Sequence, residues 1–547
     1  MSDPHSVRMS PEWVTCLNWW SCTAPATIPV FFVRAFAMHR SYRFPHPVVV
    51  VSVFLLAACG FGAAHARSFH IDPADGSDEA DGLAPGTAWK SAQPLRQRPL
   101  KPGDKVLFKA GTKHRGGVGL TGGGVRGHTV EIGRYGEGPA PVLDGAGGFA
   151  ALTLTNPDFV EVRDLEITNP GEGQTARNGL VVMANDGTAA EQLWLHRLHI
   201  HQVVGHDDRN GGAGMLLGAG RSSTGQAAHY AGLVIEHCWL HDVPFNGILV
   251  SGWETRGRDS RGDLEHPSTG IIIRANLLHD VAGDAICIIT TKGTVIEHNE
   301  VYRACLGQTR GNPEAASAGI WPHSSDHTVM RWNRVEGLRG AKDGQAFDVD
   351  YDCRDTLIES NVSRNNGTGF LLVCAGKEDG KDLGTRRTVV RNNLSVDDCA
   401  EPPGALVTLV SRVSGLFFEN NAFVITSAGD RRLLRAGDWL GPDWPEDIRW
   451  QRNLFVTAGT LYSENGSSKK IDFNSNLWSG TFRVEPTDSK AHHGDPDFLR
   501  PPGTSLNTAV GRGSAAALVG FKPFDLSKAG LPAESRLLEH ARAARER

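Results

Sequence analysis

The sequence predicts an all-β protein that folds as a single parallel β-helix, for three reasons. First, a short motif recurs along the chain, in which apolar residues and a polar pair precede an asparagine and another apolar residue. Second, successive copies lie at least 23 residues apart, which matches the shortest coil of a β-helix. Third, helical periodicity is lacking until the tail ESRLLEHARAARER. Such a coil cannot bury its own apolar side, so the coils must stack on one another.

The motif reads IIIRANLL, VIEHNEV, VMRWNRV, LIESNVS, VVRNNLS, FFENNAF, RWQRNLF and DFNSNLW. Its asparagines are Asn276, Asn299, Asn333, Asn361, Asn393, Asn421, Asn453 and Asn476. We expect them to stack, because asparagine tolerates the left-handed turn conformation and its amide can bond to the next asparagine. Separations above the minimum indicate coils with inserted loops.

The same pattern divides the chain into four parts. Residues 1–66 are interpreted as a wrongly assigned start followed by a signal peptide at about 38–66, because basic residues precede the apolar run VVVVSVFLLAAC. Residues 67–150 form an N-terminal entry or cap segment, residues 151–500 form the coils, and residues 501–547 form a C-terminal cap and tail. The apolar run is too short to predict a membrane span.

These features predict an exported protein, secreted or periplasmic. Cleavage after AHA would release it before Arg67, whereas LAAC resembles a bacterial lipobox and would leave a lipid anchor on Cys59. The net charge of −5 gives no basic patch of the kind that nucleic-acid binding needs. Six cysteines follow the signal without CxxC spacing, so a zinc or redox site is not expected, while one or two disulfides stay open.

Several segments resemble bacterial right-handed β-helix proteins of the pectin-lyase-like superfamily. They are FHIDPADGSDEADGLAPGTAWKS, LKPGDKVLFKAGTKHRGG, IGRYGEGPAPVLDG, NGTGFLLVC and GFKPFDLSKAGL. The resemblance implies a right-handed, secreted β-helix and a carbohydrate-active enzyme. The polygalacturonase pattern and the basic motif of pectate lyases are both absent, so the resemblance does not carry over a substrate.

The candidate site begins from the stretch FDVDYDC, residues 347–353. On a strand, Asp348, Asp350 and Asp352 would share one face, because alternate residues point the same way. Carboxylates two residues apart are about 6.6 Å apart at Cα, close to the spacing that lets an inverting glycosidase hold a water between acid and base. Close carboxylates also raise one another's pKa, which keeps one protonated as a general acid.

Stacking the neighbouring coils extends this row. We align Ile248, Ile286, Ile320, Phe347 and Phe370 as one inward column, with Val250, Ile288, Pro322, Val349 and Leu372 as the next. This alignment predicts that Trp321 lies beside Asp348 and His323 beside Asp350, with Lys377 one coil further on. Trp321 offers a flat face for a sugar ring, and His323 a proton shuttle.

Three functions remain open. A glycoside hydrolase would use two of the aspartates as acid and base, with no cofactor. A polysaccharide lyase would bind Ca²⁺ through Asp348, Asp350 and Asp352 against a uronate, with Lys377 or His323 as the base. A non-catalytic carbohydrate-binding β-helix is the third, in which the aspartates are a solvated surface or hold a structural Ca²⁺. We place the hydrolase first, because carboxylates outnumber lysines, and expect a polysaccharide partner in every case.

Other polar residues are interpreted as structural. Asp284 is read as a turn residue, and the HD pairs at 241–242 and 279–280 as turn caps on successive coils. The 22 histidines show no spacing typical of a metal site.

Overall fold

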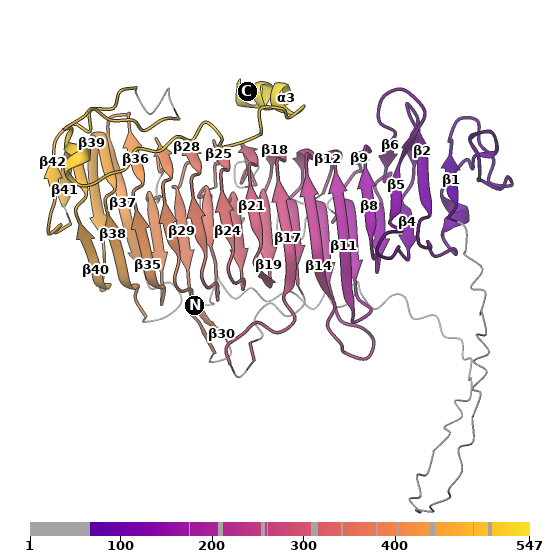
Figure 1. Ribbon diagram of the computed structural model, residues 1–547, viewed down its shortest axis with the longest axis horizontal. Coiled ribbons are helices and arrows are strands. Elements are labelled where there is room, and N and C mark those ends of the chain that lie inside the picture. The colour runs from indigo at the N-terminus through magenta and orange to yellow at the C-terminus, as the bar shows by residue number, and fades with distance from the viewer. Residues whose placement is uncertain are drawn as a thin grey trace, which may run out of the picture. The chain divides into compact units, whose positions relative to one another are not determined.

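The computed structural model describes residues 66–546, apart from 174, 206–211, 253–257, 260, 308–315, 341–342, 379–380, 402–403, 438–442, 485 and 501–505. Contacts divide the chain into two units, Met1–Ala64 and His65–Arg547, and the first lies outside the described residues. The second is a parallel β-helix of three ladders of strands (Figure 1). The parallel β-helix predicted from the repeats is therefore confirmed.

The first ladder forms a separate sheet. Its strands are β1 (Ser68–Ile71), β2 (Lys105–Lys109), β5 (Val130–Tyr135), β8 (Val160–Arg163), β11 (Ala189–His196), β14 (His229–Glu236), β17 (Ser268–Arg274), β21 (Val295–Glu297), β24 (Val329–Arg331), β27 (Leu357–Glu359), β32 (Val389–Arg391), β35 (Ser414–Glu419), β38 (Glu446–Gln451) and β40 (Lys469–Asn474), with β20 (Thr291–Lys292) beside β17.

The second ladder follows it in each coil. Its strands are β3 (Lys113–Arg115), β6 (Val142–Asp144), β9 (Glu166–Asn169), β12 (His199–Val203), β15 (Trp239–Val243), β18 (Leu277–Val281), β22 (Glu300–Tyr302), β25 (Arg334–Glu336), β28 (Val362–Arg364), β33 (Leu394–Val396), β36 (Ala422–Ile425), β39 (Leu454–Glu464), β41 (Leu477–Val484) and β42 (His492–His493).

The third ladder completes the coil and merges with the second through the long strand β39. Its own strands are β4 (Val118–Thr121), β7 (Ala150–Thr155), β10 (Asn178–Ala184), β13 (Ala213–Ala219), β16 (Asn246–Ser251), β19 (Ile286–Ile289), β23 (Ile320–His323), β26 (Phe347–Val349), β29 (Leu371–Cys374), β34 (Val407–Val410) and β37 (Asp430–Gly437). An antiparallel hairpin, β30 (Gly376–Glu378) and β31 (Lys381–Leu383), extends from one coil.

The predicted asparagine stack lies at the turn between the first and second ladders. From Asn299 onward, each side-chain oxygen accepts hydrogen bonds from the previous asparagine. Each Nδ2 donates to a main-chain carbonyl and to the next side chain, as Asn361 Nδ2 does to Met330 O at 2.9 Å and to Asn393 Oδ1 at 3.0 Å. The stacking is confirmed, but the backbone reason was wrong. The left-handed residue is the one before each asparagine, for example Ser360 with φ 58°. The asparagine side chain instead replaces the hydrogen bonds that the turn interrupts.

A second buried polar stack ends at Asp398, at the turn between the second and third ladders. Its carboxylate accepts hydrogen bonds from Ser363 Oγ (2.5 Å), Ser395 Oγ (2.6 Å) and the main-chain N–H of Asn366 (2.8 Å). Burial raises the pKa of Asp398 from 3.8 to about 6, although these donors lower it. The group is therefore a buried acid that titrates below neutral pH.

Asp398→Asn is expected to alter how stability depends on pH. Because the folded-state pKa is raised, the stability contributed by Asp398 is complete below pH 3.8 and is lost as pH rises through about 6. The free energy of unfolding of the wild type relative to that of the neutral variant should fall by about 3 kcal/mol between roughly pH 4 and 7. Urea unfolding of both proteins at each pH measures this difference in free energy. A difference that stays constant with pH would show that the pKa of Asp398 is not raised in the folded state.

The inward columns of the third ladder confirm most of the predicted register. Ile248, Ile286, Ile320 and Phe347 pair in succession and are fully buried. The register predicted after Phe347 was wrong, because Phe347 pairs with Leu371 and Val349 pairs with Val373, not with Phe370 and Leu372. The Phe370 side chain is nevertheless buried, as predicted. The main-chain N–H groups of Phe370 and Leu371 both donate to Leu406 O, at 3.0 and 3.1 Å, so this coil holds an extra residue at the strand entrance.

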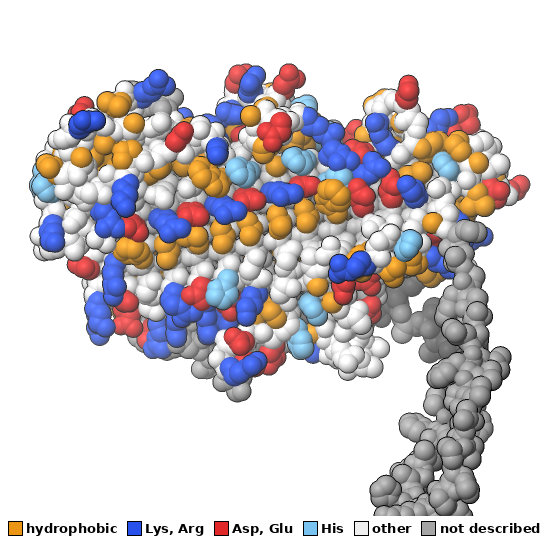
Figure 2. All heavy atoms as spheres, in the orientation of Figure 1, with side chains coloured by type: hydrophobic (Ala, Val, Ile, Leu, Met, Phe, Trp, Pro, Cys, Tyr) orange, Lys and Arg blue, Asp and Glu red, His pale blue; other side chains and the backbone are white. Residues whose placement is uncertain are grey.

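The outer face of the first ladder carries paired charges rather than a cluster of acids. Figure 2 shows a row of alternating basic and acidic side chains beside an apolar row. The ion pairs join successive coils: Arg274 to Glu236 (2.6 Å), Arg331 to Glu297 (2.8 Å) and Arg391 to Glu359 (2.7 Å). Each of these three carboxylates already has a guanidinium partner, so none of them is a candidate for an unpaired catalytic acid.

The C-terminal segment covers the outer face of the second ladder (Figure 1). Short helix α2 (Ala515–Leu518) and the following residues pack on Leu394, Ala422 and Leu454, and α3 (Leu538–Glu546) packs further back on Leu277 and Tyr302. Two 3₁₀ turns, η1 (Pro85–Thr87) and η2 (Gln93–Leu95), lie near the N-terminal end. No helix in the described part of the chain is long and apolar enough to cross a membrane.

The six described cysteines are buried, and no disulfide joins them. Cys238, for instance, is fully buried, and burial raises the pKa of its thiol to about 12. The alternative of one or two disulfides is therefore not found in this part of the chain, and these residues pack as small apolar side chains.

Candidate active site

The predicted polar cluster lies on the outer face of the third ladder. Strands β19 and β23 pair Cys287 with Trp321, and Ile320 pairs with Phe347 of β26. The same register sets Trp321 beside Asp348, as predicted. Strand β26 ends at Val349, but the N–H of Asp350 still donates to Pro322 O at 3.0 Å, which keeps Asp350 level with His323. Trp321, His323, Asp348 and Asp350 therefore come from two adjacent coils.

Asp348 is the most deeply placed acid of this group. Only 6% of its surface is exposed, and no described residue hydrogen-bonds to its Oδ1. Burial raises the pKa of Asp348 well above its usual range, and the nearby Asp350, Asp343 and Asp284 raise it further. Burial and the three neighbouring carboxyl groups therefore favour the protonated form of Asp348.

Asp343 and Asp350 are the more accessible members of this acid cluster, which we define as Asp284, Asp343, Asp348 and Asp350. Both are partly exposed, whereas Asp284 and Asp348 are buried. A carboxyl group that reacts with a polysaccharide must be reachable from solvent. The cluster thus combines two buried acids with two that a substrate can approach.

Asp284 fixes the orientation of the tryptophan. Its Oδ1 accepts hydrogen bonds from the Trp321 indole N–H and from the main-chain N–H of Ala318, both at 2.9 Å. Trp321 itself is half-buried. The interpretation of Asp284 as a plain turn residue was therefore incomplete, because its carboxylate holds a ring at the edge of the acid cluster.

His323 lies between the tryptophan and a tyrosine. Its ring is 6.4 Å from that of Trp321 and 5.7 Å from that of Tyr351, measured between centroids, and its Nδ1 is 3.0 Å from Ser324 Oγ. Only 7% of His323 is exposed. The histidine therefore borders the acid cluster as predicted, held in place by its neighbours.

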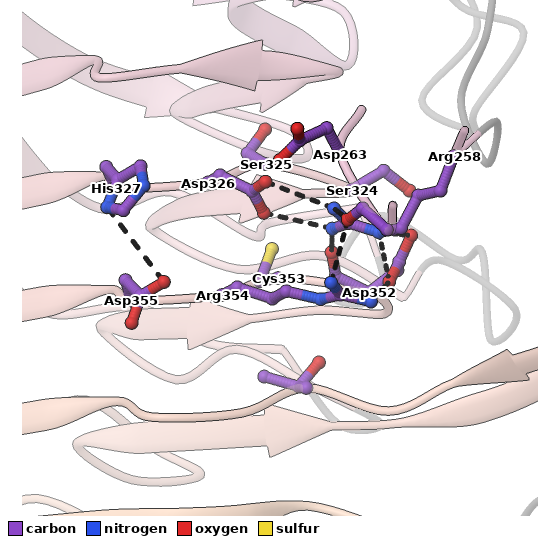
Figure 3. A network of polar contacts seen from close by, with 12 residues as sticks. Arg258, Asp263, Ser324, Ser325, Asp326, His327, Asp352, Cys353, Arg354 and Asp355 are labelled. Carbon is purple, nitrogen blue, oxygen red and sulfur yellow. Dashed lines mark hydrogen bonds and ion pairs between the residues drawn. The ribbon is translucent and has the colours of Figure 1, made fainter. Parts of the chain in front are cut away.

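Asp352 is not part of this cluster, so the predicted row of three carboxylates on one face was wrong. Asp352 sits in a turn with φ 57° and is 2% exposed. Both of its carboxylate oxygens accept from Arg258 Nε, at 2.8 and 2.7 Å, and Arg258 also binds Asp326 (Figure 3). Its left-handed backbone turns Asp352 toward the loop that carries Arg258, where it anchors that loop.

The structure does not support a calcium site made of Asp348, Asp350 and Asp352, because the Asp352 carboxylate is bound by Arg258. Within the described residues, the one group of three potential metal ligands is His199, His201 and His241. The Lys377 side chain lies outside the described residues, and so does Cys59.

Sequence reasoning missed two acids of the cluster. Asp284 lies two residues before the inward-facing Ile286 of β19, so strand alternation predicts that it also points inward. Asp343 lies in the loop before β26, where strand alternation does not apply. Neither position carries a pattern that points to the site. Asp284 reaches Asp348 only through the stacking of coils, whereas Asp343 lies five residues before Asp348 in the same coil.

The structure defines the chain as a parallel β-helix protein with acids gathered on the outer face of one ladder. No family model matches the chain. It is similar to a lacto-N-biosidase of Bifidobacterium longum subsp. longum, with 24% identity over 568 aligned residues that cover 84% of this chain and 34% of the relative. The chain thus spans about a third of that protein's length.

Solved structures agree on the fold. The native GH136 lacto-N-biosidase from Eubacterium ramulus superposes with a TM-score of 0.57 at 20% identity, covering 74% of this chain and 68% of the other. Its selenomethionine derivative gives a TM-score of 0.56 at the same identity. At this level of identity the likeness establishes the right-handed β-helix architecture.

Proposed function

We propose that this protein is a glycoside hydrolase whose reaction takes place at the acid cluster on the outer face of the third ladder. The observation that carries the proposal is the grouping of four carboxyl groups, one of them buried with a raised pKa, beside an oriented tryptophan. Hydrolysis of a glycosidic bond needs one carboxylic acid to protonate the leaving oxygen and one carboxylate as base or nucleophile.

Asp343 and Asp350 are the proposed reacting pair, because they are the exposed members of the cluster. Asp348 stays neutral behind them, since its burial disfavours the charged form. A neutral Asp348 adds no third negative charge, and it can donate a hydrogen bond to a neighbouring carboxylate. His323 borders the pair and is proposed to orient it or to relay a proton.

The substrate we propose is a glycan that contains a lacto-N-biose unit. This rests on the relatives, which are named lacto-N-biosidases. The hydrolase proposal rests on the acid cluster and stands apart from the choice of sugar.

The test is an assay of the full chain on a chromogenic glycoside of lacto-N-biose, followed by a screen of plant, algal and bacterial polysaccharides. Release of lacto-N-biose supports both parts of the proposal. Cleavage of another glycan alone would keep the hydrolase and reject the sugar.

The same screen separates the two other functions. A lyase would yield an unsaturated sugar that absorbs in the ultraviolet, and a chelator would stop a Ca²⁺-dependent reaction. Binding to a glycan without any product would indicate a non-catalytic binding protein. Either result would overturn the hydrolase proposal.

Export is part of the proposal, because a polysaccharide substrate lies outside the cytoplasm. We propose that residues 38–66 direct it. N-terminal sequencing of the mature protein distinguishes cleavage before Arg67 from a lipid-modified Cys59. A mature protein that still begins at Met1 would reject both forms.

Trp321→Ala is expected to raise KM about tenfold with little change in kcat. A ring that stacks on the sugar binds the ground state and the transition state alike, so its loss acts on affinity. Trp321→Phe, which keeps an aromatic face, should lose less. A fall in kcat at unchanged KM would show instead that the indole acts in the chemical step.

A further inference from the structure

Histidines gather on a different face, the outer face of the second ladder. His199 and His201 alternate on β12, so both point outward, and His201 pairs with His241 on β15 in the next coil. His241 pairs in turn with His279 on β18. The repeat thus stacks three histidines on successive coils, with His199 beside them.

Three of these rings converge. One ring nitrogen from each of His199, His201 and His241 lies within 4.8 Å of the others, and the Nε2 atoms of His199 and His241 are 2.9 Å apart. Zinc binds histidine nitrogen at 2.0–2.1 Å in tetrahedral geometry, which sets its ligand atoms roughly 3.4 Å apart. A modest rotation of the rings would therefore bring three nitrogens around one ion.

Two of the three rings are oriented by carboxylates. His241 Nδ1 is 2.7 Å from Asp242 Oδ2, and His201 Nε2 is 3.0 Å from Glu166 Oε1. When one imidazole nitrogen donates its proton to a carboxylate, the other nitrogen keeps its lone pair for a metal. This carboxylate–histidine arrangement is the usual support of metal-binding histidines.

The site also has an approach from solvent. A cavity of about 310 Å³ between the coils and the C-terminal segment is lined by His199, Trp239 and His540, among others. His199 and His540 each stack on Trp239, at 4.1 and 3.9 Å between ring centroids. His199 lines this cavity, and His201 and His241 are each partly exposed, so an ion can reach the cluster.

We propose that His199, His201 and His241 bind one late first-row divalent cation of the zinc class, linking two adjacent coils. Imidazole ligands suit zinc, copper and nickel, whereas Ca²⁺ and Mg²⁺ prefer oxygen. Three protein ligands leave one tetrahedral position for water. The site is separate from the acid cluster, which lies on the third ladder.

His279 provides the matched control. It belongs to the same stack, but its Nδ1 is 2.7 Å from Asp280 Oδ2 and its Nε2 accepts from the Trp239 indole at 3.0 Å. Neither of its nitrogens is available to the ion. Replacing it by phenylalanine keeps a ring in the stack and should leave metal binding intact.

The experiment measures Zn²⁺ in the tag-free full chain after chelator treatment and equilibrium dialysis against zinc. The wild type and His279→Phe should each retain one more zinc per chain than His241→Phe, which keeps a ring but loses the ligand atom. Co²⁺ should give the visible absorption of a four-coordinate site in the first two only. Equal zinc content and equal spectra in wild type and His241→Phe would overturn the proposal.

A second variant covers the case in which His241→Phe does not fold. Asp242→Asn keeps every ligand and weakens only the support of His241, so zinc affinity should fall by about 10- to 100-fold. An affinity equal to that of the wild type would overturn the proposed site.

Discussion

Asp350→Asn is expected to lower kcat about 10³-fold on the glycan that the protein cleaves, with the fold intact. A positioned acid or base contributes about 10²–10⁴ to the rate, and asparagine can neither give nor accept the proton. The Asp350 side chain is partly exposed, so the fold is expected to survive its replacement. Turnover and melting temperature, measured together, check both parts.

Asp355→Asn is the control for this prediction. It makes the same chemical change five residues further on. Asp355 is not part of the acid cluster, and its Oδ1 lies 2.6 Å from Arg387 Nε. It should retain wild-type turnover. Loss of activity in both variants, or in neither, would contradict the role proposed for Asp350.

Azide rescue would then show which residue is the acid and which is the base or nucleophile. The variants to assay are Asp343→Ala and Asp350→Ala. A small anion can replace a missing carboxylate base or nucleophile but cannot replace a missing acid. Rescue is therefore expected in one of the two variants only. Rescue of both would indicate a retaining enzyme, in which the acid also serves as the base of the second step.

Asn361→Leu is expected to cost roughly 4 kcal/mol of unfolding free energy, the largest stability effect that we predict. Asn361 Oδ1 accepts from the main-chain and side-chain amides of Asn333, at 2.9 and 3.1 Å, while its Nδ2 donates to Met330 and Asn393. Leucine removes all four bonds inside a turn where Asn361 is fully buried. Urea unfolding monitored by circular dichroism measures the change.

Arg391→Leu makes a comparable change on the outer face of the neighbouring coil. Its ion pair with Glu359 is exposed to solvent, so the loss should be under about 1 kcal/mol. A loss at Asn361 no larger than that at Arg391 would contradict the view that the asparagine stack holds the turns together.

The fold could be predicted because the same hydrogen-bonding requirement recurs in successive coils. The turn before the second ladder leaves main-chain groups without partners, and the asparagine that satisfies them recurs from Asn276 to Asn476. The register could be extended from coil to coil until Phe370. There the strand entrance holds one more residue, with Gly369 at φ 144°, and nothing in the alternation signals it.

The candidate site was only partly predictable, because only some of its residues lie on strands with regular alternation. Trp321, His323, Asp348 and Asp350 follow from regular alternation on adjacent strands. Asp352 departs from it because its own backbone is left-handed and Arg258, 94 residues away, binds it. Asp284 and the histidine cluster depend on which coils meet, and coil lengths vary with the inserted loops. Asp343 lies in the loop before β26, where strand alternation does not apply.

The most direct test of the central claim is cleavage of the substrate in ¹⁸O-labelled water, followed by mass spectrometry of the product. Hydrolysis at the acid cluster predicts that the wild type releases a sugar carrying one oxygen atom from the solvent, and that Asp350→Asn releases almost none. An unlabelled, unsaturated product would contradict the claim, and so would equal labelled product from the wild type and Asp350→Asn.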